Sequence, residues 1–246
     1  MHESYYLGAY WLSRRESVNQ CARRTETSFR LLASCDPSLS RWLEQGETLE
    51  EALEHPLNPD ATSIETRFSK QASEEGRFVE EGFSLGVWNG ETQEGASSLY
   101  QLCGDGSAQI SNNCVIRIPH EGSARHRLLQ APMLARILRA LALAWEPEWG
   151  VVTSHEHRDA VSPTSAKAGT FIGWVTYFSN RRGPLPPLPP PVRLEPVENL
   201  GTLVILTPER LTASNPAHVS LALEVAGRLS EAGLLTPLRP WDEPTQ

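Results

Sequence analysis

The side chains best suited to chemistry lie in the segment VVTSHEHRDAV, where His155, His157 and Asp159 occupy alternate positions. Residues two apart project from the same face of an extended strand, and imidazole and carboxylate groups are the usual ligands of catalytic zinc. One hypothesis is therefore a metal-dependent hydrolase, and it requires the strand to continue past Ser154.

Two observations weigh against this metal site. Residues 153 to 158 include no apolar side chain, which a solvated strand end explains equally well. The other histidines are scattered singly, at His2, His55, His120, His126 and His218, and provide no second cluster with ligand spacing. We therefore predict that His155 and His157 bind no metal.

Other signatures of catalysis are missing from the sequence. No phosphate-binding loop, dinucleotide fingerprint or GxSxG elbow occurs, and GDGSAQ (104–109) lacks the lysine of a nucleotide site. The acidic stretches are polar and look solvated, without the apolar surroundings that would raise the pKa of a carboxyl group. We therefore predict a protein that binds a partner, needs no cofactor and is not an enzyme.

The composition of the 246 residues, 39% hydrophobic and 21% charged, is ordinary for a soluble globular protein, but the net charge of −8 is unevenly distributed. Residues 36–94 hold fourteen Asp or Glu and four Lys or Arg, a net charge of −10. Such a surface disfavours nucleic acid and favours a basic protein partner, because it accelerates encounter with a cationic surface. The alternative is a face that is charged for solubility.

The chain carries no sequence signal for a membrane. MHESYYLGAYW lacks the basic start and apolar run of a signal peptide, and the apolar segment 131–145 is interrupted by Arg136 and Arg139. We expect a cytoplasmic protein. Cys21 and Cys35 would lie about 21 Å apart on one helix and so stay reduced, whereas Cys103 and Cys114 could meet on neighbouring strands.

Hydrophobic periodicity predicts an α+β fold in a single domain, 1–246. Strands are expected at 5–11, 83–89, 98–103, 114–119, 149–153, 171–179 and 201–207. The three strands between 83 and 119 suggest a meander in a mostly antiparallel sheet, covered by about three main helices at 14–35, 131–146 and 216–232. The second half repeats the order of the first loosely. Four tryptophans are predicted to be buried: Trp11, Trp88, Trp145 and Trp174.

The segment PLPPLPPP (184–191) must be extended, because proline cannot donate the hydrogen bonds of a β-ladder. It contains PxxP spacing, so a non-catalytic adaptor that binds through this segment is an alternative function. We favour a stiff connector that crosses one end of the sheet.

Five segments together resemble the immunity protein 52 family of bacterial polymorphic toxin systems. They are YLGAYW, GFSLGVWNG, LLQAPMLARILRALALAWEPEWGVVTS, GWVTYFSNRRGPLPPLP and LGTLVILT, and the similarity covers about residues 5–212. The resemblance implies a cytoplasmic antidote without catalysis of its own. Such an antidote is typically encoded beside a toxin with a restriction-endonuclease-like nuclease domain, which a secretion system delivers to competitors.

The charge and the resemblance predict the same function, an immunity protein that binds and neutralises a cognate nuclease toxin. A nuclease presents basic surface to DNA, which a concentrated acidic region can occupy or adjoin. The interface candidates are Glu44, Glu47, Glu50, Glu51, Glu54, Glu74, Glu75, Glu80, Glu81, Arg181 and Arg182. The metal hydrolase with His155, His157 and Asp159 and the proline-rich adaptor stay as alternatives.

Overall fold

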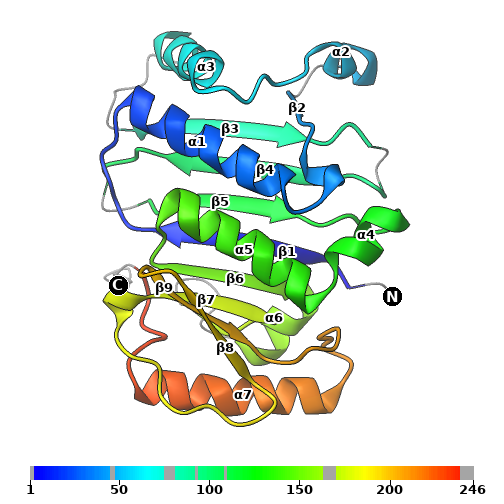
Figure 1. The fold of residues 1–246 in the computed structure, drawn as a ribbon, viewed down its shortest axis with the longest axis vertical. Helices are drawn as coiled ribbons and strands as arrows, with labels where there is room; N and C mark the ends of the chain where they lie inside the picture. Colours follow the sequence, from blue (N-terminus) through cyan, green and yellow to red (C-terminus); the bar gives the residue numbers. More distant parts are fainter. Residues whose placement is uncertain are drawn as a thin grey trace, which may run out of the picture.

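The fold was obtained as a computed structural model, which describes residues 3–44, 48–74, 81–91, 94–107, 110–162 and 170–238. Nine strands form one sheet in the order β2-β3-β4-β5-β1-β6-β7-β9-β8, and all neighbouring strands are antiparallel (Figure 1). The predicted α+β class and the antiparallel meander of β3, β4 and β5 are confirmed.

The strands are β1 (Tyr5–Trp11), β2 (Leu43–Glu44), β3 (Phe83–Trp88), β4 (Ser98–Cys103), β5 (Asn112–Arg117), β6 (Trp149–Ser154), β7 (Val175–Ser179), β8 (Arg193–Val197) and β9 (Gly201–Ile205). The α-helices are α1 (Val18–Ala33), α2 (Leu49–Glu54), α3 (Ala61–Glu74), α4 (Gly122–Leu128), α5 (Ala131–Trp145), α6 (His155–Val161) and α7 (Pro216–Glu231). The order strand, helix, three strands, helix recurs from β6 onward, but the strand pairing does not repeat.

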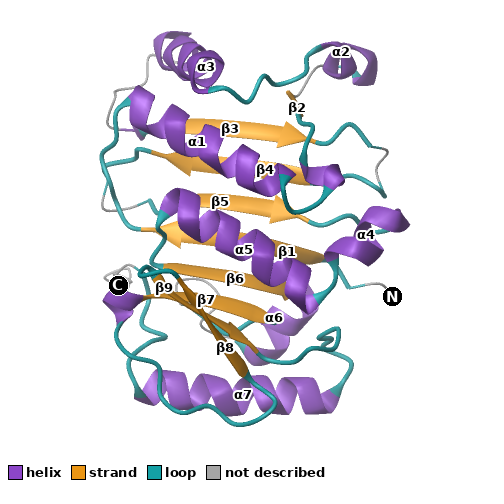
Figure 2. Ribbon diagram, in the orientation of Figure 1, coloured by secondary structure: helices purple, strands orange, loops and turns teal. Residues whose placement is uncertain are grey.

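Helices α1 and α5 lie side by side across one face of the sheet (Figure 2). α1 begins at Val18, later than predicted, because Ser17 caps it: the Ser17 hydroxyl accepts from the Gln20 amide at 3.2 Å, and the Ser17 amide donates to Gln20 Oε1 at 2.8 Å. α5 has Pro132 in its first turn and ends at Glu146, whose φ of 47° is left-handed.

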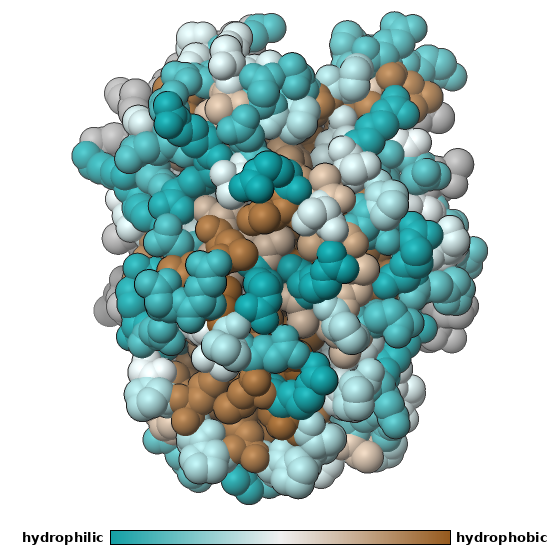
Figure 3. Space-filling view, in the orientation of Figure 1, coloured by the Kyte–Doolittle hydropathy of each residue, from teal (hydrophilic) through white to brown (hydrophobic). Residues whose placement is uncertain are grey.

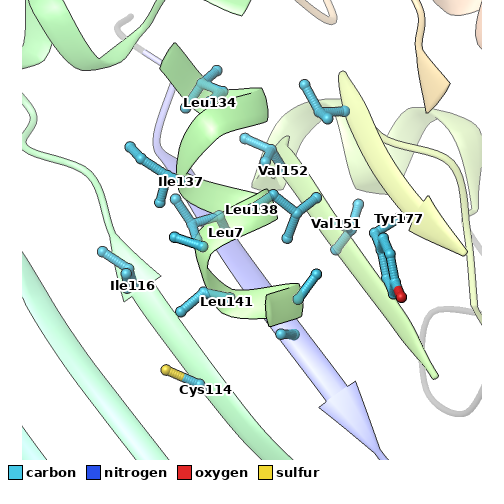
Figure 4. Packing of buried hydrophobic residues seen from close by; sticks show 14 of the residues in the cluster. Leu7, Cys114, Ile116, Leu134, Ile137, Leu138, Leu141, Val151, Val152 and Tyr177 are labelled. Carbon is cyan, nitrogen blue, oxygen red and sulfur yellow. The ribbon is translucent and has the colours of Figure 1, made fainter. Parts of the chain in front are cut away.

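The centre of the core is the contact between α5 and the middle strands (Figure 4). Leu134, Leu138 and Leu141 of α5 are fully buried together with Leu7 of β1. Gly150 allows this close approach, because a Cβ there would lie 2.9 Å from Leu138 Cδ1.

The number of main helices was underestimated, because α3 falls in the acidic region and was not predicted. Its apolar face consists chiefly of Ile64 and Phe68, one turn apart and both buried. Phe68 stacks on Phe83 with ring centroids 5.3 Å apart, and α3 packs on α1. With so few apolar positions among Ser, Thr and Glu, the helix depends on tertiary packing.

The predicted strand 171–179 is too long, and β7 begins at Val175. The Gly173 amide donates to Thr176 Oγ1 at 2.9 Å within the segment that leads into the strand. Every residue of β7 is buried, because both faces of this part of the sheet are covered. An alternation of exposed and buried side chains is therefore missing.

The prediction that these tryptophans are mostly buried is confirmed: Trp11, Trp145 and Trp174 are buried completely or nearly so, and Trp88 is mostly buried but keeps part of its ring exposed. Trp11 and Trp145 stack with centroids 5.0 Å apart, which joins β1 to the end of α5.

All four cysteines are free thiols. Cys103 lies against Cys21 of α1, and burial together with this neighbour holds the Cys103 pKa well above its usual range. Cys103 and Cys114, which could have met on neighbouring strands, are both buried free thiols, and Cys103 contacts a helix rather than Cys114.

Candidate functional site

The acidic helix α2 lies at one end of the sheet, where it follows the short edge strand β2 (Figure 1). Thr48 caps it by accepting from the Glu51 amide at 3.2 Å, and carboxylates in the first turn are favourable at the positive end of the helix dipole. Glu50, Glu51 and Glu54 are exposed. Leu53 lies between them and is 41% exposed, so the helix combines negative charge with an apolar contact point.

The other described acidic candidates, Glu44 and Glu81, differ from the exposed acids of α2. Glu44 of β2 forms an ion pair with Arg67 of α3 at 3.2 Å, which partly neutralises it. Glu81 is exposed, but it lies before Phe83, where β3 begins. β2 pairs with Trp88, where β3 ends, so Glu81 lies about 20 Å along the strand from β2. Glu47, Glu75 and Glu80 lie outside the described residues, as does the side chain of Glu74.

The two arginine candidates have intramolecular partners. Arg181 pairs with Glu148 at 3.2 Å, and Arg182 Nη2 donates to the carbonyl oxygen of Leu234 at 2.9 Å. They follow β7, six strand positions from β2, so they lie about 29 Å from the acidic helix across the sheet. The structure therefore does not join them to the acidic candidates.

An aromatic surface that the sequence reasoning did not identify lies on the uncovered face of β3, β4 and β5. Residues of β3 and β5 alternate between buried and more exposed positions, because the helices that the structure describes cover only one face here. The strand register places Trp88, Ser98 and Arg117 in one row of the other face and Gly86, Tyr100 and Val115 in the next. We call Trp88, Tyr100, Val115 and Arg117 the open sheet face. Tyr100 is 50% exposed at its centre, beside a glycine.

The open sheet face is continuous with the acidic end of the molecule. Trp88 is the register partner of Leu43 in β2, and its indole nitrogen donates to the carbonyl oxygen of Glu44 at 3.4 Å. That Trp88 and Tyr100 share one face could have been found from the alternation of β3 and β4, but which face is left without a described helix is decided by the tertiary structure.

The segment with His155, His157 and Asp159 is not a continuing strand. β6 ends at Ser154, whose hydroxyl accepts from the His157 amide at 3.0 Å and so caps α6. His155 stacks on Tyr6 with centroids 4.8 Å apart, and Asp159 pairs with Arg158 at 2.8 Å. Alternate residues of a helix do not share one face, so the premise of the metal hypothesis is wrong. Within the described ranges, no group of three His, Cys, Asp or Glu side chains could hold a metal ion.

His157 instead points into the core. It is fully buried, and its Nδ1 lies 3.3 Å from Thr153 Oγ1. In the described part of the chain, Nε2 has no hydrogen-bond partner. Burial lowers the pKa of His157 to about 4, against smaller influences from Glu3, which raises it, and His218, which lowers it.

The proline-rich segment 184–191 shows a threefold period of exposure, as expected of a polyproline helix with three residues per turn. Pro184, Pro187 and Pro190 are exposed, whereas Leu185 and Leu188 pack against the core. Arg228 of α7 donates to the Pro187 carbonyl at 3.1 Å. Two of the three faces of the segment therefore lie against the protein.

Figure 3 shows the molecule from the side of α1 and α5, with a notch between the two projections formed by α3 and α2.

No single described helix is long and apolar enough to cross a membrane, and α4 and α5 pass such a test only as a pair bent by 82°.

Comparison with known proteins gives a family and a fold. The family model described as Immunity protein 52 matches residues 3–238. Among solved structures, the Pseudomonas aeruginosa T6SS protein PA0821 has a similar fold, with a TM-score of 0.53 and 14% sequence identity over 91% of this chain and 75% of that chain. The search of curated proteins found no matching relative.

Proposed function

Because this chain belongs to the immunity protein 52 family, as its segments suggested, we propose that it binds and neutralises a cognate toxin that is a restriction-endonuclease-fold nuclease. Neutralisation requires a complex and no catalysis by the immunity protein, which acts in the cytoplasm of the producing cell. A similar fold in a protein described as belonging to a T6SS supports delivery of the toxin by a secretion system.

The observation that carries the proposal is the concentration of negative charge at one end of the sheet. Residues 36–94 have a net charge of −10, and α2 exposes Glu50, Glu51 and Glu54 to solvent. A nuclease carries basic side chains that contact phosphates, and such a surface attracts this helix. Exposed charges of this kind chiefly set the rate of association.

The open sheet face supplies the anchors that the acidic helix lacks. Tyrosine, tryptophan and arginine dominate the hot spots of protein interfaces, and Tyr100, Trp88 and Arg117 are three such residues on one flat surface. Trp88 joins this surface to β2, so one partner can contact both. We propose that the toxin covers the open sheet face while the acidic helix steers its approach.

Reversal of the charges of the acidic helix, with Glu50→Lys, Glu51→Lys and Glu54→Lys together, is expected to slow association with the nuclease domain encoded beside the gene. The expected decrease is about ten-fold at low salt and smaller at high salt, because screening weakens exposed charges beyond a Debye length of about 8 Å at physiological ionic strength. Stopped-flow mixing at two salt concentrations measures the rate constant.

The matched control reverses Glu198, Glu209 and Glu231, which are exposed in the second half and change the net charge equally. It should leave the association rate nearly unchanged. Equal rates for the wild type and the α2 variant would show that the acidic helix serves solubility alone.

Truncation of the central anchor, Tyr100→Ala, is expected to weaken the complex by about 2 kcal/mol, or about 30-fold, mainly through faster dissociation. The ring is half exposed, so the free protein should keep its thermal stability. Surface plasmon resonance gives both rate constants. Leu223→Ala, at a 49% exposed position on α7, is the control, and equal affinity of both variants would remove the open sheet face from the interface.

The two alternatives receive less support. A hydrolase would require His155, His157 and Asp159 to converge, but they contact Tyr6, the core and Arg158. An adaptor would require a polyproline helix that is accessible along its length, whereas Leu185 and Leu188 pack against the core and the exposed positions are Pro184, Pro187, Pro190 and Pro191.

A further inference from the structure

A pocket of about 430 Å³ lies away from the acidic helix and the open sheet face. Arg125 and His126 of α4, Leu129 and Gln130 at the turn into α5, Trp174, and residues 208–210 after β9 line it. Figure 1 shows α4, the start of α5 and the chain after β9 on the same side of the molecule. The proposed toxin interface assigns no role to this pocket.

Two guanidinium groups meet at Tyr5 beside the pocket. The central carbons of Arg125 and Arg210 lie 5.6 Å and 5.2 Å from the centroid of the Tyr5 ring. Tyr5 also donates to the carbonyl oxygen of Leu211, which holds the loop that carries Arg210. Both cations therefore contact one buried aromatic side chain.

Arg125 is only 4% exposed, and its hydrogen-bond acceptors are neutral. It donates to the carbonyl oxygens of Pro119 at 2.7 Å and Glu3 at 2.8 Å. The Glu3 carboxylate lies beside this cluster, because its Oε2 is 3.2 Å from the Tyr5 hydroxyl, and it also accepts from Ser154 Oγ at 2.6 Å and from the Ala213 amide at 2.8 Å.

Neither Arg125 nor Arg210 forms an ion pair with a carboxylate in the described part of the chain. A buried cation without a direct ion pair is costly, and a second cation nearby increases the cost. Burial and then repulsion by Arg210 lower the pKa of Arg125, although Tyr5, Glu121 and Glu3 act in the opposite direction. A bound anion would relieve this repulsion.

The start of α5 adds a third source of positive potential. Gln130 is the N-cap of this 15-residue helix, but its side chain makes no capping hydrogen bond and donates to the His126 carbonyl instead, at 3.2 Å. The first amide groups of a helix and its dipole favour a negative charge placed there. Because Gln130 and Leu129 line the pocket, this helix end adjoins the two arginines.

We propose that this pocket binds an oxyanion, a carboxylate or a phosphate, between Arg125 and Arg210 at the start of α5. Guanidinium groups match the geometry of both anions and bind them through paired hydrogen bonds. Glu209 also lines the pocket and is exposed, so it opposes the anion and lowers its affinity. The site does not depend on the identity of the toxin.

The test is a titration of the ¹⁵N-labelled full chain with inorganic phosphate and, separately, with acetate, at constant ionic strength set by chloride. Saturable shifts of the amides of Gln130 and Arg210 are expected for at least one anion. Arg210→Gln should weaken binding about ten-fold, because it removes a charged donor from the anion. Glu209→Gln should strengthen it.

The exposed Arg30→Gln on α1 is the matched control and should bind as the wild type does. Arg210 is substituted rather than Arg125 because Arg210 is exposed and its loss should not unfold the protein. Stronger binding of phosphate than of acetate would assign the site to a phosphate, and the reverse order to a carboxylate. Shifts that never saturate, or equal affinity of the Arg210 variant and the wild type, would overturn the proposal.

Discussion

Replacement of Trp174 by alanine is expected to lower the free energy of unfolding by about 3 to 5 kcal/mol. The side chain is fully buried and packs edge-on against Tyr5 with centroids 6.2 Å apart. Its indole nitrogen donates to the Thr207 carbonyl at 2.9 Å, so the substitution leaves both a cavity and a buried acceptor without its donor. Urea denaturation followed by circular dichroism measures the change.

Trp174→Phe separates the two contributions, because phenylalanine keeps much of the packing but cannot donate to Thr207. It should lose less stability than the alanine variant. Leu223→Ala, at an exposed position, should change the unfolding free energy by no more than about 0.5 kcal/mol. A loss below about 1 kcal/mol for Trp174→Ala would contradict the role of this ring in the core.

Acid is expected to destabilise the protein through His157. The pKa of this buried imidazole is lowered to about 4, whereas in the unfolded chain it is about 6.5, so the unfolded state takes up the proton first as the pH falls. Stability should therefore decrease between pH 6.5 and pH 4, by about 3 kcal/mol in total from this group. Urea denaturation at half-unit pH intervals gives the dependence.

His157→Gln removes the titrating group and should flatten the dependence in this interval, whatever its effect on stability at neutral pH. The exposed His55→Gln should keep the dependence of the wild type. Equal slopes for the wild type and His157→Gln would show that His157 does not cause the acid sensitivity.

Local periodicity determined the elements whose own side chains specify them. β1 was predicted at its observed bounds from its aromatic run, and α5 from its apolar residues between Pro132 and Pro147. Strand alternation has a period of two and helix burial a period of 3.6, and both are visible within a few residues. The family could likewise be inferred from the five segments that carry the resemblance, and the family model that matches residues 3–238 confirms it.

Where contacts come from distant residues, the local pattern was insufficient. α3 has only Ile64 and Phe68 as a fully buried pair, and it is helical because α1 and Phe83 cover them. In the segment 155–161, His155, His157 and Asp159 lie at alternate positions, as ligands on one face of a strand would, but Ser154 caps a helix there. Cys103 meets Cys21, 82 positions earlier in the sequence, rather than a neighbour on the adjacent strand.

The candidate site divides in the same way. Composition alone located the negative charge in residues 36–94, because charge can be counted without a fold. Only the tertiary structure decided that the three carboxylates of α2 are all exposed to solvent. It also decided that Arg182 donates to the Leu234 carbonyl and that the Tyr100 side chain is exposed. The helices cover one face of β3, β4 and β5 and leave the other open, and this choice depends on where distant segments pack rather than on the alternation of the strands themselves.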